Sequence, residues 1–174
     1  DQSAVFRSPF SSPSPREQHV GGRLTIDLSA LAGNWMRLRD RSRPADCSAV
    51  VKGDGYGIGL ERAAETFWNA GCRTFFVALP EEGMRLREVL PEATIYVLNG
   101  LFRGAEADYR EARLIPVLGS PGEIEDWGRF ARSVERELPA AIHVDTGMNR
   151  LGLTLAEAEG FAGVNMEEGV APKL

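Results

Sequence analysis

Residues 74–98, TFFVALPEEGMRLREVLPEATIYVL, contain the pattern that decides the fold. Two short apolar runs, Thr74–Leu79 and Thr94–Leu98, enclose a segment that begins with Pro80 and two glutamates. Proline and acidic residues are typical of the first turn of a helix. Short runs of β-branched and aromatic residues are typical of buried strands. The stretch therefore predicts a strand, a helix and a second strand.

The same alternation continues along the chain. Three further apolar runs, at residues 47–51, 114–118 and 140–144, place strand starts near 47, 74, 94, 114 and 140, spaced by 27, 20, 20 and 26 residues. The strongest helix start between them is Ser120-Pro121-Gly122-Glu123, a capping box with proline at the first helical position. Such spacing predicts an α/β fold with a parallel sheet. Periodicity alone leaves an open doubly wound sheet and a barrel as alternatives.

The two ends of the chain lack this pattern. Residues 1–23 are rich in serine and proline, which predicts a disordered or extended N-terminal arm. Prolines interrupt every apolar run there that could serve as a signal peptide, so we expect a cytoplasmic protein. We expect residues 24–163 to be the folded part, and residues 164–174, which contain no apolar run, to be an irregular tail.

Composition excludes several classes of protein. The chain has 174 residues, of which 43% are hydrophobic and 26% charged, with a net charge of −5, as in ordinary globular domains. No apolar run approaches the roughly 18 to 20 residues of a membrane helix, and no basic block indicates a nucleic-acid partner. Cys47 and Cys72 lie far apart without the spacing of metal ligands, so we expect two reduced cysteines and no metal site.

The first candidate site follows the first apolar run, where Lys52 precedes Gly53-Asp54-Gly55-Tyr56-Gly57-Ile58-Gly59. Ligands of parallel α/β folds bind at the carboxyl ends of strands. A lysine at that position is partly removed from water, which favours the neutral amine that Schiff-base chemistry requires. The glycines allow the backbone to approach a ligand closely, and Tyr56 adds a hydroxyl group. A solvated lysine before a flexible turn is the alternative; G-x-G-x-x-G and P-loop motifs are excluded.

The second candidate site follows the fifth apolar run, in the sequence His143-Val-Asp-Thr-Gly-Met-Asn-Arg150-Leu-Gly152. An arginine after a strand end and a tight turn can bind a carboxylate or a phenolate through charge-assisted hydrogen bonds. The alternatives are a surface arginine and, for His143, a histidine of the core.

Together the two segments resemble the two N-terminal signatures of bacterial alanine racemases. The resemblance rests on Ala49-Val-Val-Lys52-x-Asp54-x-Tyr56-Gly57-x-Gly59, on Ala78-Leu-Pro-Glu-Glu-Gly83, and on Val144-Asp-Thr-Gly-Met-x-Arg150-Leu-Gly152. It implies a fold-type III enzyme, in which pyridoxal 5'-phosphate is held in a TIM-type (β/α)8 barrel that precedes a separate C-terminal β domain. With about five of eight strands and no β domain, we expect this chain to be an incomplete barrel whose remaining part lies elsewhere.

The resemblance also implies the roles of individual residues. Lys52 binds the cofactor as a Schiff base and acts as one catalytic base, Tyr56 contacts the cofactor phosphate, and Arg150 contacts the cofactor's phenolic oxygen and the substrate carboxylate. His143 stands where many members carry a carboxylated lysine that supports the arginine, so we expect it to support Arg150, with a bound anion as a hypothesis for the missing negative charge. Ile58 replaces a histidine that is common in the lysine loop.

The activity implied by the resemblance is the interconversion of L- and D-alanine, which supplies D-alanine for peptidoglycan. The family's second acid/base is a tyrosine from the C-terminal domain of the partner in a homodimer, so we expect this chain to be inactive alone. The alternatives are another fold-type III enzyme, either a racemase of broader specificity or a decarboxylase, and a non-catalytic remnant that binds the cofactor.

Overall fold

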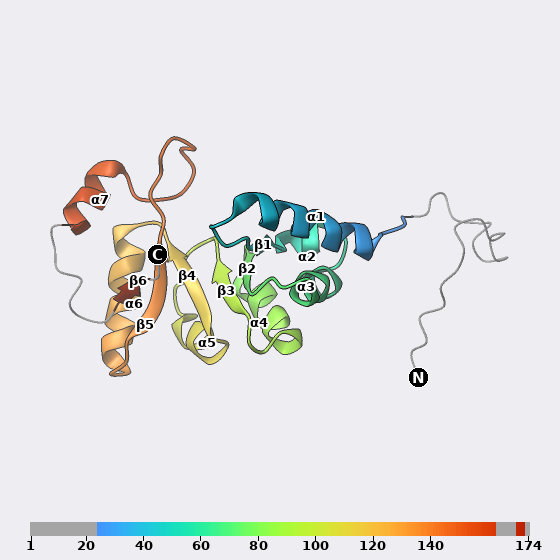
Figure 1. Ribbon diagram of the computed structural model, residues 1–174. Coiled ribbons are helices and arrows are strands. Elements are labelled where there is room, and N and C mark those ends of the chain that lie inside the picture. The colour runs from blue at the N-terminus through green and yellow to red at the C-terminus, as the bar shows by residue number, and fades with distance from the viewer. Residues whose placement is uncertain (1–23, 163–169, 173–174) are drawn as a thin grey trace, which may run out of the picture.

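Six parallel strands form one sheet in chain order. The computed structural model describes residues 24–162 and 170–172 (Figure 1). Its strands pair in the order β1-β2-β3-β4-β5-β6, and they are β1 (Ala49–Val50), β2 (Thr74–Val77), β3 (Thr94–Val97), β4 (Leu114–Leu118), β5 (Leu138–Ile142) and β6 (Val170–Pro172). A doubly wound sheet reverses its strand order at a switch point, whereas this order runs on without reversal. The expected α/β fold with an incomplete barrel of TIM type is confirmed.

Helices alternate with the strands. They are α1 (Leu28–Ser42), α2 (Lys52–Tyr56), α3 (Leu60–Asn69), α4 (Pro80–Val89), α5 (Glu106–Glu111), α6 (Pro121–Ser133) and α7 (Leu155–Ala162). Asp27 caps α1 by accepting from the N–H of Ala30 at 2.9 Å, and Ser120 caps α6 by accepting from the N–H of Glu123 at 3.3 Å. The predicted capping position at Ser120 is therefore confirmed. No helix within the described ranges is long and apolar enough to cross a membrane.

The core lies between the sheet and the helices that follow the strands. Alternate strand residues such as Phe75, Val77 and Ile95 are fully buried and pack with helix residues that include Leu86 and Trp127. Because side chains alternate across a strand, the intervening residues occupy the other face of the sheet. There Phe76 and Tyr96 stack with ring centroids 5.0 Å apart, and Val50 is 42% exposed. The face opposite the helices is thus apolar and only partly covered.

Residues 170–172 correct one expectation. We expected no strand in residues 164–174, yet β6 pairs in parallel with residues 138–140 of β5. The expectation was wrong for these three residues because strand pairing is made by backbone groups, so a short strand at a sheet edge needs no apolar run. The expected N-terminal arm, residues 1–23, lies outside the described residues, as do residues 163–169 and 173–174.

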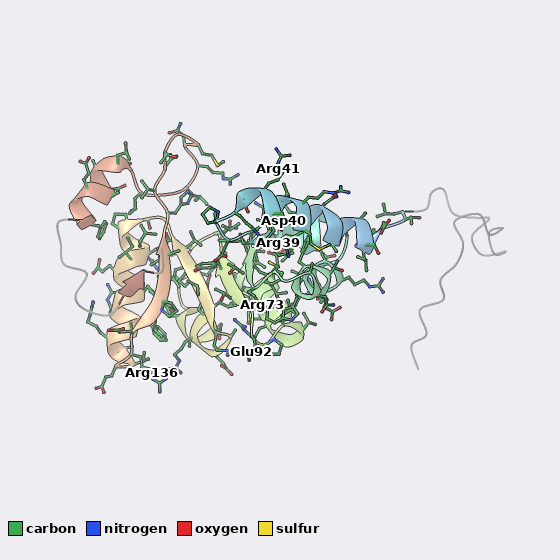
Figure 2. All side chains as sticks on the ribbon, viewed as in Figure 1. Arg39, Asp40, Arg41, Arg73, Glu92 and Arg136 are labelled. Atoms are coloured by element: carbon green, nitrogen blue, oxygen red, sulfur yellow. The ribbon has the colours of Figure 1, made fainter. Side chains whose placement is uncertain are left out.

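α1 is attached to the chain between α3 and β2 by Arg39, near the end of the helix (Figure 2). One guanidinium nitrogen donates to the carbonyl of Ala70 at 3.5 Å, and the group lies 5.5 Å from the centre of the Trp35 ring. A neighbouring carboxylate, Asp40, pairs with Arg39 at 2.8 Å. Trp35 is only 5% exposed. The packing of its ring therefore holds α1 in place, and the Arg39 guanidinium lies over that ring.

The loop after β5 is closed at its base by the backbone. The N–H of Asp145 donates to the carbonyl of Leu153, and the N–H of Leu153 donates to the carbonyl of His143, both at 2.8 Å. Within the loop, the Asp145 carboxylate accepts from the N–H groups of Gly147 at 2.9 Å and Asn149 at 3.0 Å. These hydrogen bonds hold the pKa of Asp145 below its usual value, and the charge of His143 contributes less. The loop protrudes from the sheet (Figure 1).

Arg87 of α4 binds the carbonyls of two chain turns. Its guanidinium donates to Ala112 at 2.8 Å, Pro91 at 2.8 Å, Ala93 at 2.7 Å and Arg113 at 2.9 Å. We expect Arg87→Met to lower the free energy of unfolding by about 2–4 kcal/mol, because the carbonyls lose a charged donor in a partly buried place. Urea unfolding followed by circular dichroism measures the change.

Arg129→Met is the matched control for Arg87→Met. Among the described residues, Arg129 pairs with Glu125 and Asp126 on the surface of its own helix, so its loss should cost about 0–1 kcal/mol. Equal losses in the two variants would contradict the role given to Arg87.

Acid should loosen the loop after β5. The pKa of Asp145 is lower in the folded chain, so the order that its carboxylate imposes is fully present above pH 3.8 and is lost as the pH falls through a midpoint below 3.8. The N–H signals of Gly147 and Asn149, followed by NMR during titration, should report that midpoint. Asp145→Asn should abolish the transition. A midpoint at or above 3.8 would refute the assignment.

Candidate functional site

Lys52 lies where the sequence predicts, directly after β1. The preceding residue, Val51, is 1% exposed and donates its N–H to the carbonyl of Phe76 at 2.9 Å. Lys52 itself is half-buried, and its ammonium group makes no hydrogen bond or ion pair with any described residue. The Lys52 amine, which pairs with no described residue, therefore lies at the carboxyl end of β1.

The chain after Lys52 turns in the left-handed sense. Gly53, Asp54 and Gly55 have φ values of 62°, 53° and 63°, and Tyr56 follows with 57°. The N–H of Gly57 donates back to the carbonyl of Gly53 at 2.9 Å. Glycine adopts this conformation readily, whereas it costs roughly 1–2 kcal/mol for residues such as Asp54 and Tyr56. The glycines at positions 53 and 55 thus lower the conformational cost of this turn.

Asp54 connects this turn to two helices. Its Oδ1 accepts from the N–H of Leu60, at the start of α3, at 3.1 Å and from the guanidinium of Arg85, on α4, at 3.1 Å. Arg85 also pairs with Glu61 at 2.7 Å. The Leu60 N–H, and after it Arg85, hold the pKa of Asp54 below its usual value. Asp54 therefore stays ionised and helps to hold a turn that is locally unfavourable.

The buried side chain of Glu82 also contacts this turn. This glutamate is only 8% exposed. Its Oε1 accepts from the N–H of Gly53 at 2.6 Å, and its Oε2 accepts from the N–H groups of Ala78 at 2.8 Å and Leu79 at 3.1 Å. Each carboxylate oxygen thus has a donor, which a buried charge requires.

Arg150 and His143 line one cavity of about 370 Å³ at the carboxyl ends of β3, β4 and β5, named here the Arg150 cavity. Arg150 is exposed and makes no hydrogen bond or ion pair with any described residue. No hydrogen bond joins it to His143 within the described part of the chain, and the His143 ring lies close to Gly152. The support of Arg150 by His143 stays a prediction. The wall residues are Leu98, Asn99, Gly100, Val117, Gly119, Ser120, Glu123, His143, Arg150, Leu151 and Gly152.

Tyr109 and Glu123 fix the wall of the Arg150 cavity. The buried phenol of Tyr109 donates to the carbonyl of Gly100 at 2.7 Å, and burial raises the pKa of this phenol. Glu123 accepts from the N–H groups of Leu101 at 2.9 Å and Gly119 at 2.8 Å. The loops after β3 and β4 are thereby tied together.

The structure thus brings the predicted residues together in two pairs. Lys52 and Tyr56 share the turn after β1, with Tyr56 68% exposed, whereas His143 and Arg150 share the Arg150 cavity, whose wall includes neither Lys52 nor Tyr56. All four follow the carboxyl ends of parallel strands and so belong to one edge of the sheet.

Sequence reasoning missed the role of Glu82. We interpreted this residue only as part of the first turn of a helix. A signal was present, because Pro80-Glu81-Glu82 and Pro121-Gly122-Glu123 both place a glutamate two residues after a proline that starts a helix. In the second case the capping residue Ser120 precedes the proline and identifies the helix start. In the first case the residue before the proline is Leu79, whose side chain cannot cap a helix.

The residues at this edge fit pyridoxal 5'-phosphate, an anionic aldehyde. Lys52 offers an unpaired amine for the aldehyde carbon, and Arg150 offers an unpaired guanidinium that no described carboxylate neutralises. A lysine amine and a fixed cation are the groups that such a cofactor needs. The Glu82 contact, which orders the peptide beside Lys52, adds the preorganisation that a covalent site requires.

Comparison with known proteins places these residues in a family. Residues 26–170 match the family described as "Alanine racemase, N-terminal domain". The alanine racemase of Methylobacterium sp. (strain 4-46) is 56% identical over 154 residues, which cover 88% of this chain and 42% of that protein. The alanine racemase of Rhodospirillum rubrum is 45% identical over 145 residues, which cover 82% of this chain and 39% of that protein.

Solved structures agree with this match. The crystal structure of alanine racemase from Bartonella henselae, with covalently bound pyridoxal phosphate, is 42% identical and superposes with a TM-score of 0.75 over 78% of this chain and 40% of that one. The chain spans about 40% of the length of the relatives that it matches. The family assignment rests on a match that covers most of the chain and includes Lys52 and Arg150, and we conclude that this chain belongs to the alanine racemase N-terminal domain family.

Proposed function

We propose that this chain is the lysine-bearing part of a pyridoxal-phosphate-dependent alanine racemase. The observation that carries the proposal is the uncommitted, half-buried amine of Lys52 at the carboxyl end of β1, in a chain of this family. No described residue pairs with the Lys52 amine, which supports a role for this amine in binding the cofactor. The whole enzyme interconverts L- and D-alanine.

Each site residue has a role in this proposal. When bound, pyridoxal phosphate supplies an electron sink that delocalises the negative charge left on the substrate carbon when its α-proton is removed. Lys52 holds the cofactor and takes or returns the α-proton on one face of the substrate. Arg150 binds the substrate carboxylate and the cofactor's phenolic oxygen, Tyr56 binds the phosphate, and His143 supports Arg150.

The proton carrier for the opposite face comes from outside this chain. The sequence contains three tyrosines. Tyr109 is buried and donates to a backbone carbonyl, Tyr96 stacks on Phe76 on the face of the sheet opposite the helices, and Tyr56 belongs to the turn that carries Lys52 itself. By resemblance to the family, the second carrier in this proposal is a tyrosine from the partner subunit of a homodimer.

The remaining features of the proposal concern the biological setting. The substrate is a small amino acid, and the product, D-alanine, serves peptidoglycan synthesis in the cytoplasm. Neither a nucleic acid nor a membrane is a partner. Because a partner subunit supplies the family's second acid/base, we expect this chain to be inactive when it is alone.

Cofactor capture tests the role of Lys52. Lys52 and Lys173 are the two lysines of the sequence, so borohydride reduction in the presence of pyridoxal phosphate gives an adduct that peptide mapping assigns without ambiguity. We expect the adduct at Lys52 to form at least about tenfold faster than at Lys173, because Lys52 lies half-buried at the carboxyl ends of the parallel strands, where Arg150 also lies. The variant Lys52→Arg should form no adduct at position 52.

Equal labelling of the two lysines in native protein would contradict this function. An adduct at Lys52 without racemase activity in any full-length form would favour a cofactor-binding remnant. Activity of a full-length form on other amino acids, or loss of their carboxylate as carbon dioxide, would favour one of the other fold-type III enzymes.

Arg150→Gln should weaken cofactor capture. Loss of a charge-assisted contact costs about 1.5–3 kcal/mol, so the pyridoxal phosphate concentration for half-maximal labelling of Lys52 should rise about 10- to 100-fold. Arg110→Gln, which alters an exposed arginine on α5, is the matched control and should leave that concentration unchanged. The same concentration in both variants and the native chain would remove Arg150 from the cofactor site.

A further inference from the structure

Two side chains of α4, one helical turn apart, hold the turn that follows Lys52. Glu82 Oε1 accepts from the N–H of Gly53 at 2.6 Å, and Arg85 donates to Asp54 Oδ1 at 3.1 Å. Gly53 and Asp54 are the first two residues after Lys52. The helix after β2 therefore contacts the chain at the two residues that directly follow Lys52.

The Glu82 contact is the stronger of the two. This carboxylate is 8% exposed, and its Oε2 is already used by the N–H groups of Ala78 and Leu79 at the start of its own helix. The Gly53 N–H, in contrast, belongs to the turn after β1, outside the helix that carries Glu82. Arg85 and Asp54, in contrast, are 49% and 55% exposed, so water screens their pairing.

We propose that Glu82 is a positioning residue for Lys52, with Arg85 as a second and weaker anchor. By fixing the peptide between Lys52 and Gly53, Glu82 holds the left-handed turn and so directs the Lys52 side chain to one place at the sheet edge. Glu82 does not touch the reacting atoms. This inference deepens the proposed function and rests on it.

Glu123 supplies a matched control inside the same chain. Its Oε1 accepts from the N–H of Leu101, in the loop after β3, and its Oε2 accepts from the N–H of Gly119 and the hydroxyl of Ser120. The geometry repeats that of Glu82, with three donors of which one belongs to the preceding unit. Glu123 has no hydrogen bond with the Lys52 turn among the described residues.

The experiment compares Glu82→Gln with Glu123→Gln in the full chain. A glutamine keeps the size of the side chain but has one carbonyl oxygen, so it cannot accept from all three donors. In Glu82→Gln, amide hydrogen exchange of residues 53–57 should become about 10- to 100-fold faster, because a charge-assisted hydrogen bond is lost. In Glu123→Gln the increase should instead be confined to residues 100–102.

Lysine chemistry distinguishes positioning from a merely structural effect. In Glu82→Gln, the yield of the reduced pyridoxal phosphate adduct at Lys52 relative to Lys173 should fall about tenfold, and the visible absorption band of the Schiff base before reduction should shift or weaken. Acylation by an amine-reactive ester, which needs no cofactor, should become faster at Lys52 relative to Lys173. Glu123→Gln should leave the acylation ratio of the native chain unchanged, even if both variants lose similar thermal stability.

Arg85→Met keeps the test decisive if Glu82→Gln fails to fold. It removes the exposed anchor to Asp54 together with the ion pair to Glu61 and leaves Glu82 in place, so it should accelerate exchange at residues 53–57 severalfold, whereas Arg129→Met should not. Acylation at Lys52 that is unchanged in Glu82→Gln, or changed equally in Glu123→Gln, would overturn the inference. If native protein formed no cofactor adduct at Lys52, the proposed function would fail, and the exchange and acylation results would still decide whether Glu82 positions Lys52.

Discussion

The parallel pairing of β1 to β5 in chain order is the constraint on which the candidate site depends. Because the strands are parallel, their carboxyl ends all lie along one side of the sheet. Each connecting segment then brings the chain back to the opposite side, where the next strand begins. Lys52 follows β1, Glu82 follows β2, Glu123 follows β4 and Arg150 follows β5. Residues that lie almost a hundred positions apart in sequence thus reach one edge without any direct contact between them.

The turn after Lys52 shows how a locally unfavourable conformation persists. Asp54 and Tyr56 adopt positive φ values of 53° and 57°, which their own side chains disfavour. The turn has hydrogen bonds within itself, and it also forms hydrogen bonds with Glu82 and Arg85 of α4. The conformation is therefore a property of two neighbouring strand–helix units, and the turn sequence alone does not specify it. Strain maintained in this way is typical of functional sites.

The sequence allowed the elements to be predicted well and their contacts poorly. Apolar runs revealed β1 to β5, and Ser120 revealed the start of α6, because burial and capping depend on residue type at short range. β6 was missed because edge pairing uses backbone groups. Glu82 was missed because its partner, Gly53, is 29 positions away and contributes only an N–H group. Periodicity cannot show that Lys52 and Arg150 line different parts of the edge, since that depends on the curvature of the sheet.

Each half of the candidate site carries its own support. The Lys52 turn is held by α3 and α4, and the Arg150 cavity is held by Tyr109 and Glu123. The contacts that hold the Lys52 turn and the Arg150 cavity therefore lie within this chain. The distance between the turn and the cavity depends on the strand pairing through β2, β3 and β4. Closure of a barrel would fix that pairing, because a closed sheet has no free edge at which its curvature can change. In the proposed enzyme, the rest of the protein thus adds two things: the second proton carrier and a fixed distance between the lysine and the arginine.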